Sequence, residues 1–184
     1  MEKYIWLFPV LFVFHDLEEI IGFGVWGKKN VTIIEKRMPR VATAYKKMFA
    51  QYSTEGMALA VFEELLLCIL ICVLAIHFQL YQLWIGVFIA FILHMFLHMI
   101  QAIIWRGYIP AVVTSVIAAP VSIYIVADSL KILNFDAGKV ILWSLIGLIT
   151  IAVNVKVAHF LMHWLTKKLN LQAIEERERS GQDT

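Results

Sequence analysis

The sequence predicts an all-α, polytopic membrane protein: a helical bundle of about five transmembrane helices plus one interfacial amphipathic helix. Of its 184 residues, 61% are hydrophobic and 16% are charged, and the mean hydropathy is +0.77. This composition leaves too little polar surface to cover a water-soluble globular domain. Several apolar stretches also exceed the ~18 residues that mark a membrane-spanning helix. We therefore expect a multi-pass protein of the cell membrane.

Five apolar stretches have the length of a span: Tyr4–Trp26, Gly56–His77, Tyr81–Trp105, Ile109–Ala127 and Lys139–Leu165. We expect them to form one transmembrane domain over residues 1–170, followed by a polar C-terminal tail over residues 171–184. The first stretch has no small-residue cleavage site and should be retained. Cys68 and Cys72 lie within an apolar run, where cysteines are more often packing residues than disulfide partners.

A basic segment follows the first span and has helical periodicity. Apolar and aromatic residues recur at helical spacing from Val41 to Tyr52, while most of the nearby Lys and Arg residues lie off that stripe. Pro39 suits the first turn of a helix. We predict an interfacial helix over about 31–52 that faces anionic lipid headgroups. The alternative is a solvated basic loop.

The distribution of Lys and Arg predicts the orientation in the membrane. Gly27–Glu55 contains seven of these residues, the turn after Trp105 contains one, and the segment from Lys167 onward contains four. The opposite side has three. Because cytoplasmic loops carry an excess of Lys and Arg, we predict a cytoplasmic C-terminus and an N-terminus outside.

Four ionisable residues stand in the middle of the first span: His15, Asp16, Glu18 and Glu19. A charged side chain at this depth costs at least ~2.5–3.5 kcal/mol, so such groups are normally paired, protonated or bound to a cation. The i, i+3 and i+4 spacing of His15, Glu18 and Glu19 places them on one helix face. The motif therefore directs one imidazole and two carboxylates to one side of the helix.

Three later spans carry similar groups: Glu63 and Glu64 lie in the second span, His94 and His98 in the third, and His159 and His163 in the last. His94 and His98, and also His159 and His163, have the i, i+4 spacing of chelating histidines on a helix. With alternating spans, these groups lie between about 6 and 16 Å from the cytoplasmic ends of their helices. The alternative is that each pair makes only hydrogen bonds between helices. We predict a shared metal site whose ligands are His15, Glu18, Glu19, Glu63, Glu64, His94, His98, His159 and His163.

The pattern His15-Asp16-Leu17-Glu18-Glu19 resembles the HXXEE-domain membrane proteins, and the resemblance extends over the spans. It implies a membrane location and the importance of His15, Glu18 and Glu19, but no reaction. A looser resemblance is to membrane fatty-acid desaturases and hydroxylases, which bind two irons through histidine boxes. This chain lacks their H-x-x-H-H box and has more carboxylates.

The predicted ligands suit two transition-metal ions bridged by Glu, with iron favoured and zinc or manganese as alternatives. We expect Glu18, Glu19 and Glu64 to be the catalytic carboxylates. The favoured function is a di-iron oxidoreductase that acts on a lipid or other hydrophobic small molecule. The alternatives are a zinc-dependent lipid hydrolase, a metal or proton transporter, and a metal-free lipid isomerase. We expect the membrane as a partner, and no nucleic acid.

Overall fold

A computed structural model describes the backbone of residues 1–182 and the side chains of residues 1–172. It contains the helices α1 (Glu2–Ile5), α2 (Leu7–Arg37), α3 (Pro39–Ala50), α4 (Thr54–His77), α5 (Tyr81–Trp105), α6 (Val112–Leu133) and α7 (Ala137–Gln182). No strand occurs within residues 1–182. The prediction of an all-α helical bundle is therefore confirmed.

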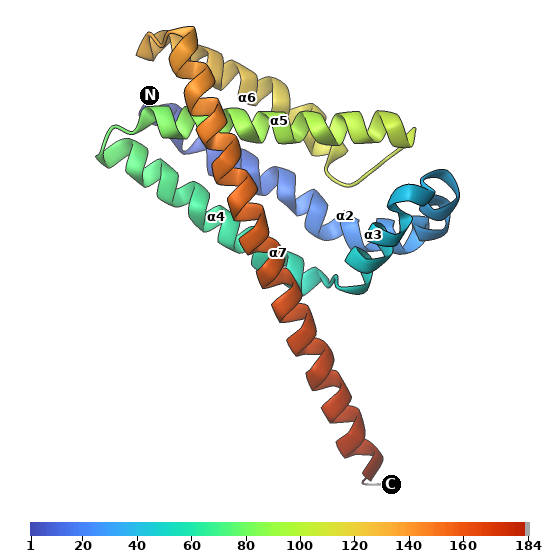
Figure 1. Cartoon of the computed structure of the whole chain (residues 1–184). Coiled ribbons are helices and arrows are strands. Elements are labelled where there is room, and N and C mark those ends of the chain that lie inside the picture. The colour runs from blue at the N-terminus through green and yellow to red at the C-terminus, as the bar shows by residue number, and fades with distance from the viewer. Residues whose placement is uncertain (183–184) are drawn as a thin grey trace.

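The helices α4, α5, α6 and α7 are each long and apolar enough to cross a membrane, which is consistent with a multi-pass membrane protein. The first predicted span, Tyr4–Trp26, lies mostly in α2, which does not meet the same criterion of length and apolarity. Its apolar stretch is interrupted by three carboxylates, those of Asp16, Glu18 and Glu19. Nevertheless α2 packs beside α4 and α6 (Figure 1). Its crossing of the membrane, like the orientation of the termini, stays a prediction.

Two predicted boundaries fall inside continuous helices. Helix α2 continues past Trp26 to Arg37. The backbone changes direction at Met38, where φ is −135° and ψ is 58°. The range predicted as an interfacial helix is thus divided between the end of α2 and α3, which begins with Pro39. The backbone of α7 likewise continues as helix to Gln182, beyond the predicted start of the tail.

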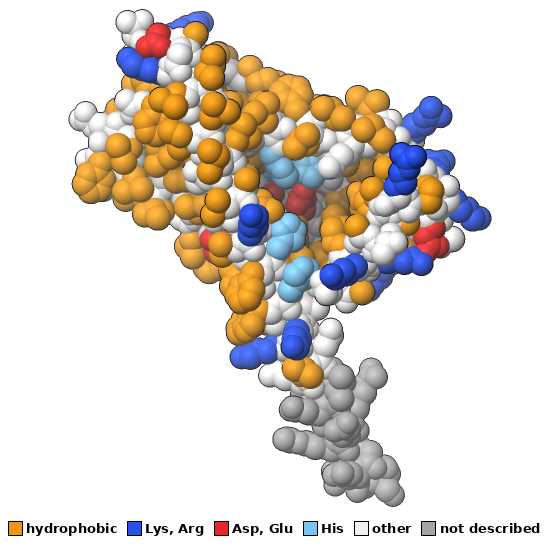
Figure 2. All heavy atoms as spheres, in the orientation of Figure 1, with side chains coloured by type: hydrophobic (Ala, Val, Ile, Leu, Met, Phe, Trp, Pro, Cys, Tyr) orange, Lys and Arg blue, Asp and Glu red, His pale blue; other side chains and the backbone are white. Residues whose placement is uncertain are grey.

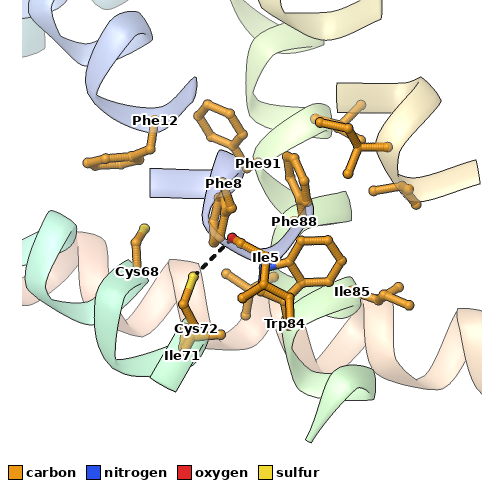
Figure 3. Packing of buried hydrophobic residues seen from close by; sticks show 14 of the residues in the cluster. Ile5, Phe8, Phe12, Cys68, Ile71, Cys72, Trp84, Ile85, Phe88 and Phe91 are labelled. Atoms are coloured by element: carbon orange, nitrogen blue, oxygen red, sulfur yellow. Dashed lines mark hydrogen bonds between the residues drawn. The ribbon is translucent and has the colours of Figure 1, made fainter. Parts of the chain in front are cut away.

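An aromatic core holds together the end of the bundle where α2 begins (Figure 3). The ring of Phe8 on α2 stacks on Phe88 of α5 with a centroid distance of 4.7 Å, and Trp84 packs edge-on against Phe88. Cys68 and Cys72 are buried and not disulfide-bonded, as expected. The thiol of Cys72 donates to the carbonyl of Ile5 over 3.3 Å, which ties α4 to the end of α1.

Glycines bring α7 close to its neighbours at two places. A Cβ atom built on Gly86 of α5 would lie 2.0 Å from the carbonyl oxygen of Trp143, and one built on Gly147 would lie 2.1 Å from the carbonyl oxygen of Gly86. At the other end, a Cβ on Gly56 of α4 would lie 2.6 Å from the carbonyl oxygen of Met162. Only glycine permits such close backbone contact. Between these contacts α7 crosses the bundle obliquely (Figure 1).

Candidate metal centre

The helices α2 and α5 run side by side and are aligned by aromatic contacts at both ends. Phe8 contacts Phe88 near one end, and Trp26 contacts Trp105 near the other with a centroid distance of 5.3 Å. The indole N–H of Trp26 also donates to the carbonyl of Tyr108 over 2.8 Å. This alignment sets the middle of α2, with its ionisable residues, opposite the histidines of α5.

Four side chains meet there, one i, i+4 pair from each helix: His15 and Glu19 from α2, and His94 and His98 from α5. One potential ligand atom from each residue lies within 4.8 Å of the other three. The Nε2 atom of His98 is 2.9 Å from Oε1 of Glu19 and 2.9 Å from Nε2 of His94, and the latter is 4.0 Å from Oε1 of Glu19. Atoms that bind one metal at about 2.0–2.2 Å lie roughly 3 Å apart, so this group has the size of a metal site.

His15 is the fully buried member of the group. Its ring stands edge-on to His94 and His98, with centroid distances of 5.4 and 5.2 Å. Its Nδ1 atom lies 3.2 Å from the hydroxyl of Thr114, whereas its Nε2 atom is buried without a hydrogen-bond partner among the described residues. Nδ1 of His98, by contrast, is buried without a hydrogen-bond partner among the described residues.

The hydroxyl of Thr114 fixes the protonation of the His15 ring. Its shortest contact is 2.7 Å to Oε2 of Glu18, which as a carboxylate can only accept, so the hydroxyl donates there. It then accepts from Nδ1–H of His15, and the lone pair of Nε2 stays free. A histidine that binds a metal through one nitrogen normally donates the other N–H in this way. The structure thus prepares His15 as a ligand through Nε2.

Glu18 has a different task from Glu19. Its Oε2 atom accepts the backbone N–H of Thr114 over 2.8 Å, and its Oε1 atom accepts that of Val113 over 3.4 Å. These two N–H groups belong to the first turn of α6, where a carboxylate also interacts favourably with the helix dipole. Glu18 therefore caps α6 and holds Thr114, while Glu19 faces the histidines of α5.

The remaining predicted ligands lie outside the four-residue group. Oε2 of Glu63 accepts from the amide of Asn154 over 3.3 Å. The ring of His159 contacts the carbonyl of Val155 on its own helix over 2.8 Å, and that of His163 contacts the carbonyl of Gln51 over 3.2 Å. The structure thus brings together His15, Glu19, His94 and His98, and places apart from them Glu18, Glu63, Glu64, His159 and His163.

A cavity of about 200 Å³ opens beside the group, between α2, α4, α5 and α7. Figure 2 shows histidine and acidic side chains gathered in a hollow of the hydrophobic surface. Most of the lining is apolar, and the polar lining residues are Asp16, Glu19, Glu64, His94, Asn154 and His159. Glu64 and His159, both predicted as ligands, therefore share this cavity with Glu19 and His94.

A second cavity of about 120 Å³ also has Glu19 in its lining. It is lined by His98 and Gln101 from α5, by Trp26 from α2, and by Tyr45 from α3. Glu19 lines both cavities, whereas His94 lines only the larger and His98 only the smaller. The four-residue group therefore contributes side chains to the lining of both cavities.

Comparison with known families identifies the chain. Residues 6–125 match a family model described as a protein of unknown function with HXXEE motif. The chain belongs to the HXXEE family. No curated protein and no solved structure matches it. In this HXXEE protein, the His and the second Glu of the motif belong to the four-residue group, and the first Glu caps α6.

Sequence reasoning gave no role to Thr114, which joins the first Glu of the HXXEE motif to its His. The residue was visible only as one of a few hydroxyl side chains in the span that follows Pro110. A signal that could have singled it out is its place in the first turn of that helix, where backbone N–H groups need an acceptor.

Proposed function

We propose that this HXXEE protein is an intramembrane metalloenzyme whose transition-metal ion is held by His15, Glu19, His94 and His98. The observation that carries the proposal is the convergence of three imidazoles and one carboxylate, with ligand atoms within 4.8 Å of one another. The free Nε2 of His15, oriented by Thr114, supports the same conclusion. Groups of this kind within a membrane domain require a function because their burial is costly.

The number of protein ligands favours iron or manganese over zinc. Zinc prefers four ligands in a tetrahedron, so a site with four protein ligands leaves no position for a reactant. Non-haem iron sites with two histidines and one carboxylate keep further positions open, and a fourth protein ligand still leaves room on a six-coordinate ion. We therefore favour an oxidoreductase that uses iron.

The large, mostly apolar cavity beside the group supports a lipid or other hydrophobic molecule as the substrate. When bound, iron would supply activation of dioxygen for oxidation of a substrate C–H bond. Hydroxylation in this way consumes dioxygen, two protons and two electrons from a reductant, and yields the alcohol and one water. The residues that line the cavity would bind the hydrocarbon part of the substrate, hold it beside the four-residue group, and keep bulk water away from it.

We propose one ion for this group. The second ion predicted from the sequence would need ligands from the cavity wall, where Asp16, Glu64 and His159 are available. Metal analysis distinguishes one ion from two.

A zinc-dependent hydrolase is the second candidate, and one observation favours it. His15, His94 and His98 are three imidazoles, which suffice for a catalytic zinc ion with a bound water. Glu19 would then act as the general base instead of a ligand. In this version Glu19→Gln should retain zinc and lose activity, whereas in the iron version it should lose both.

The test is elemental analysis of the protein purified without chelators after expression with added iron, zinc and manganese. We expect about one equivalent of iron per chain, and loss of most of it in His15→Ala. Mass spectrometry of lipids incubated with the protein, dioxygen and a reductant should then show an added oxygen atom. Less than about a tenth of an equivalent of any transition metal would refute the proposal.

A further inference from the structure

We infer that the larger cavity binds a single-chain amphiphile with a cationic, hydrogen-bond-donating head, such as a long-chain amine or amino alcohol. The head lies at Asp16 and Glu64, and the alkyl chain runs away from the four-residue group toward Phe8 and Val87. This inference rests on the proposed function in taking the cavity as the substrate site. Beyond the proposed function, the inference gives the chemical class of the substrate and the direction in which its alkyl chain lies in the cavity.

The shape of the cavity suits one alkyl chain. Its lining on α2 extends from Phe8 to Glu19, which is about 17 Å along the helix, and its lining on α4 extends from Met57 to Ile71, which is about 21 Å. A volume of about 200 Å³ over that length is a narrow passage. The end near Phe8, Ile71 and Val87 is apolar, so a hydrocarbon chain is the complementary occupant there.

The other end of the cavity is acidic. Asp16, Glu19 and Glu64 all line it, and no Lys or Arg occurs among the described lining residues. Asp16 is only 4% exposed, and its Oδ2 atom has no hydrogen-bond partner among the described residues. Within residues 1–172, no basic side chain forms an ion pair with Asp16 or Glu64.

These carboxylates determine the kind of head that fits. A buried acceptor without a partner is costly, and an ammonium or hydroxyl group of a ligand would satisfy it. A carboxylate or phosphate head would instead bring a further acidic group next to three acidic side chains in a space of low polarity. Charge therefore favours a long-chain amine over a fatty acid of the same length.

The test compares a long-chain primary amine with the fatty acid of equal carbon number. Binding is measured by isothermal titration to the protein in detergent, both iron-loaded and after removal of metal by a chelator. We expect the amine to bind at least about tenfold more tightly than the acid in the metal-free protein. Asp16→Asn and Glu64→Gln should each weaken amine binding by about tenfold.

Glu63→Gln is the matched control, because Glu63 adjoins Glu64 on α4 but does not line the cavity. Its amide can still bond to Asn154, and amine binding should be unchanged. At the apolar end, Val87→Phe should shift the preferred amine toward shorter chains. If Asp16→Asn fails to fold, Glu64→Gln alone decides, since Glu64 is only partly buried.

Equal binding of amine and acid, no binding of either, or full amine binding in both acid variants would overturn the inference. So would a second equivalent of metal that displaces the amine, because Asp16 and Glu64 would then be metal ligands. Metal content measured in the same samples keeps the two proposals separate. A protein that holds one ion but binds no amine retains the proposed metal centre and refutes only the cationic substrate.

Discussion

Replacing Thr114 with Val tests whether this residue prepares His15 for a metal. The two side chains have nearly the same shape, so the change removes a hydroxyl and little else. That hydroxyl lies 2.7 Å from Oε2 of Glu18 and 3.2 Å from Nδ1 of His15. Glu18 keeps the backbone N–H of residue 114, whereas Nδ1 of His15 loses its acceptor.

The magnitude follows from these contacts. A buried N–H left without a partner costs about 1–3 kcal/mol, and moving the proton to Nε2 would block the atom that faces the metal. Loss of a group that orients a ligand histidine typically lowers metal affinity ~10–100-fold. We therefore expect Thr114→Val to weaken metal binding by that factor while the protein remains folded.

The assay is titration of the metal-free protein against a chelator of known affinity, with thermal unfolding measured on the same samples. Thr114→Ser keeps the hydroxyl and should restore the affinity. Ser115→Ala is the control, because Ser115 is also buried and its Oγ atom has no partner among the described residues. A Thr114→Val protein with wild-type metal affinity would show that this hydrogen bond does not prepare the site.

Metal content, membrane orientation and helix packing each give one further prediction. His98→Ala should lose its metal and His163→Ala should keep it, as judged by elemental analysis; equal loss in both would restore the larger ligand set predicted from the sequence. In intact cells, Lys46→Cys should be shielded from membrane-impermeant thiol reagents and Asn134→Cys should react, and the reverse pattern would invert the predicted topology. Gly147→Ala places a methyl group against a backbone carbonyl of α5 and should cost about 1–3 kcal/mol or more, so an unchanged melting temperature would contradict the close contact.

Hydropathy and helical spacing were sufficient to predict the fold class. The nine ligands predicted from the sequence include the two pairs that the structure brings together, but spacing alone did not separate these pairs from the other five residues. His15 and Glu19, like His94 and His98, are four residues apart, and each pair occupies one helix face. Contact between the pairs also depends on the alignment of α2 with α5. Because successive spans cross the membrane in opposite directions, an approximate depth for each pair could be predicted from the sequence. The two depths agreed, so the sequence predicted that the pairs lie at the same level.

The remaining assignments depend on how each helix is rotated about its axis, which spacing does not reveal. His159 and His163 have the same spacing as the pair on α5, yet they contact backbone carbonyls. Glu18 and Glu19 are neighbours in sequence, and only the packing of α6 against α2 separates a capping carboxylate from one that faces the histidines. Glu18 and Thr114 are 96 positions apart, so no local pattern connects them.

The two cavities that meet at Glu19 bear on the order in which reactants reach the site. His94 lines one cavity and His98 the other, so atoms of the same group face two cavities. A chain that fills the larger cavity leaves the approach through the smaller one free for a small molecule. Steady-state kinetics with two varied reactants should therefore show random-order binding, whereas a site with a single entrance would impose a compulsory sequence.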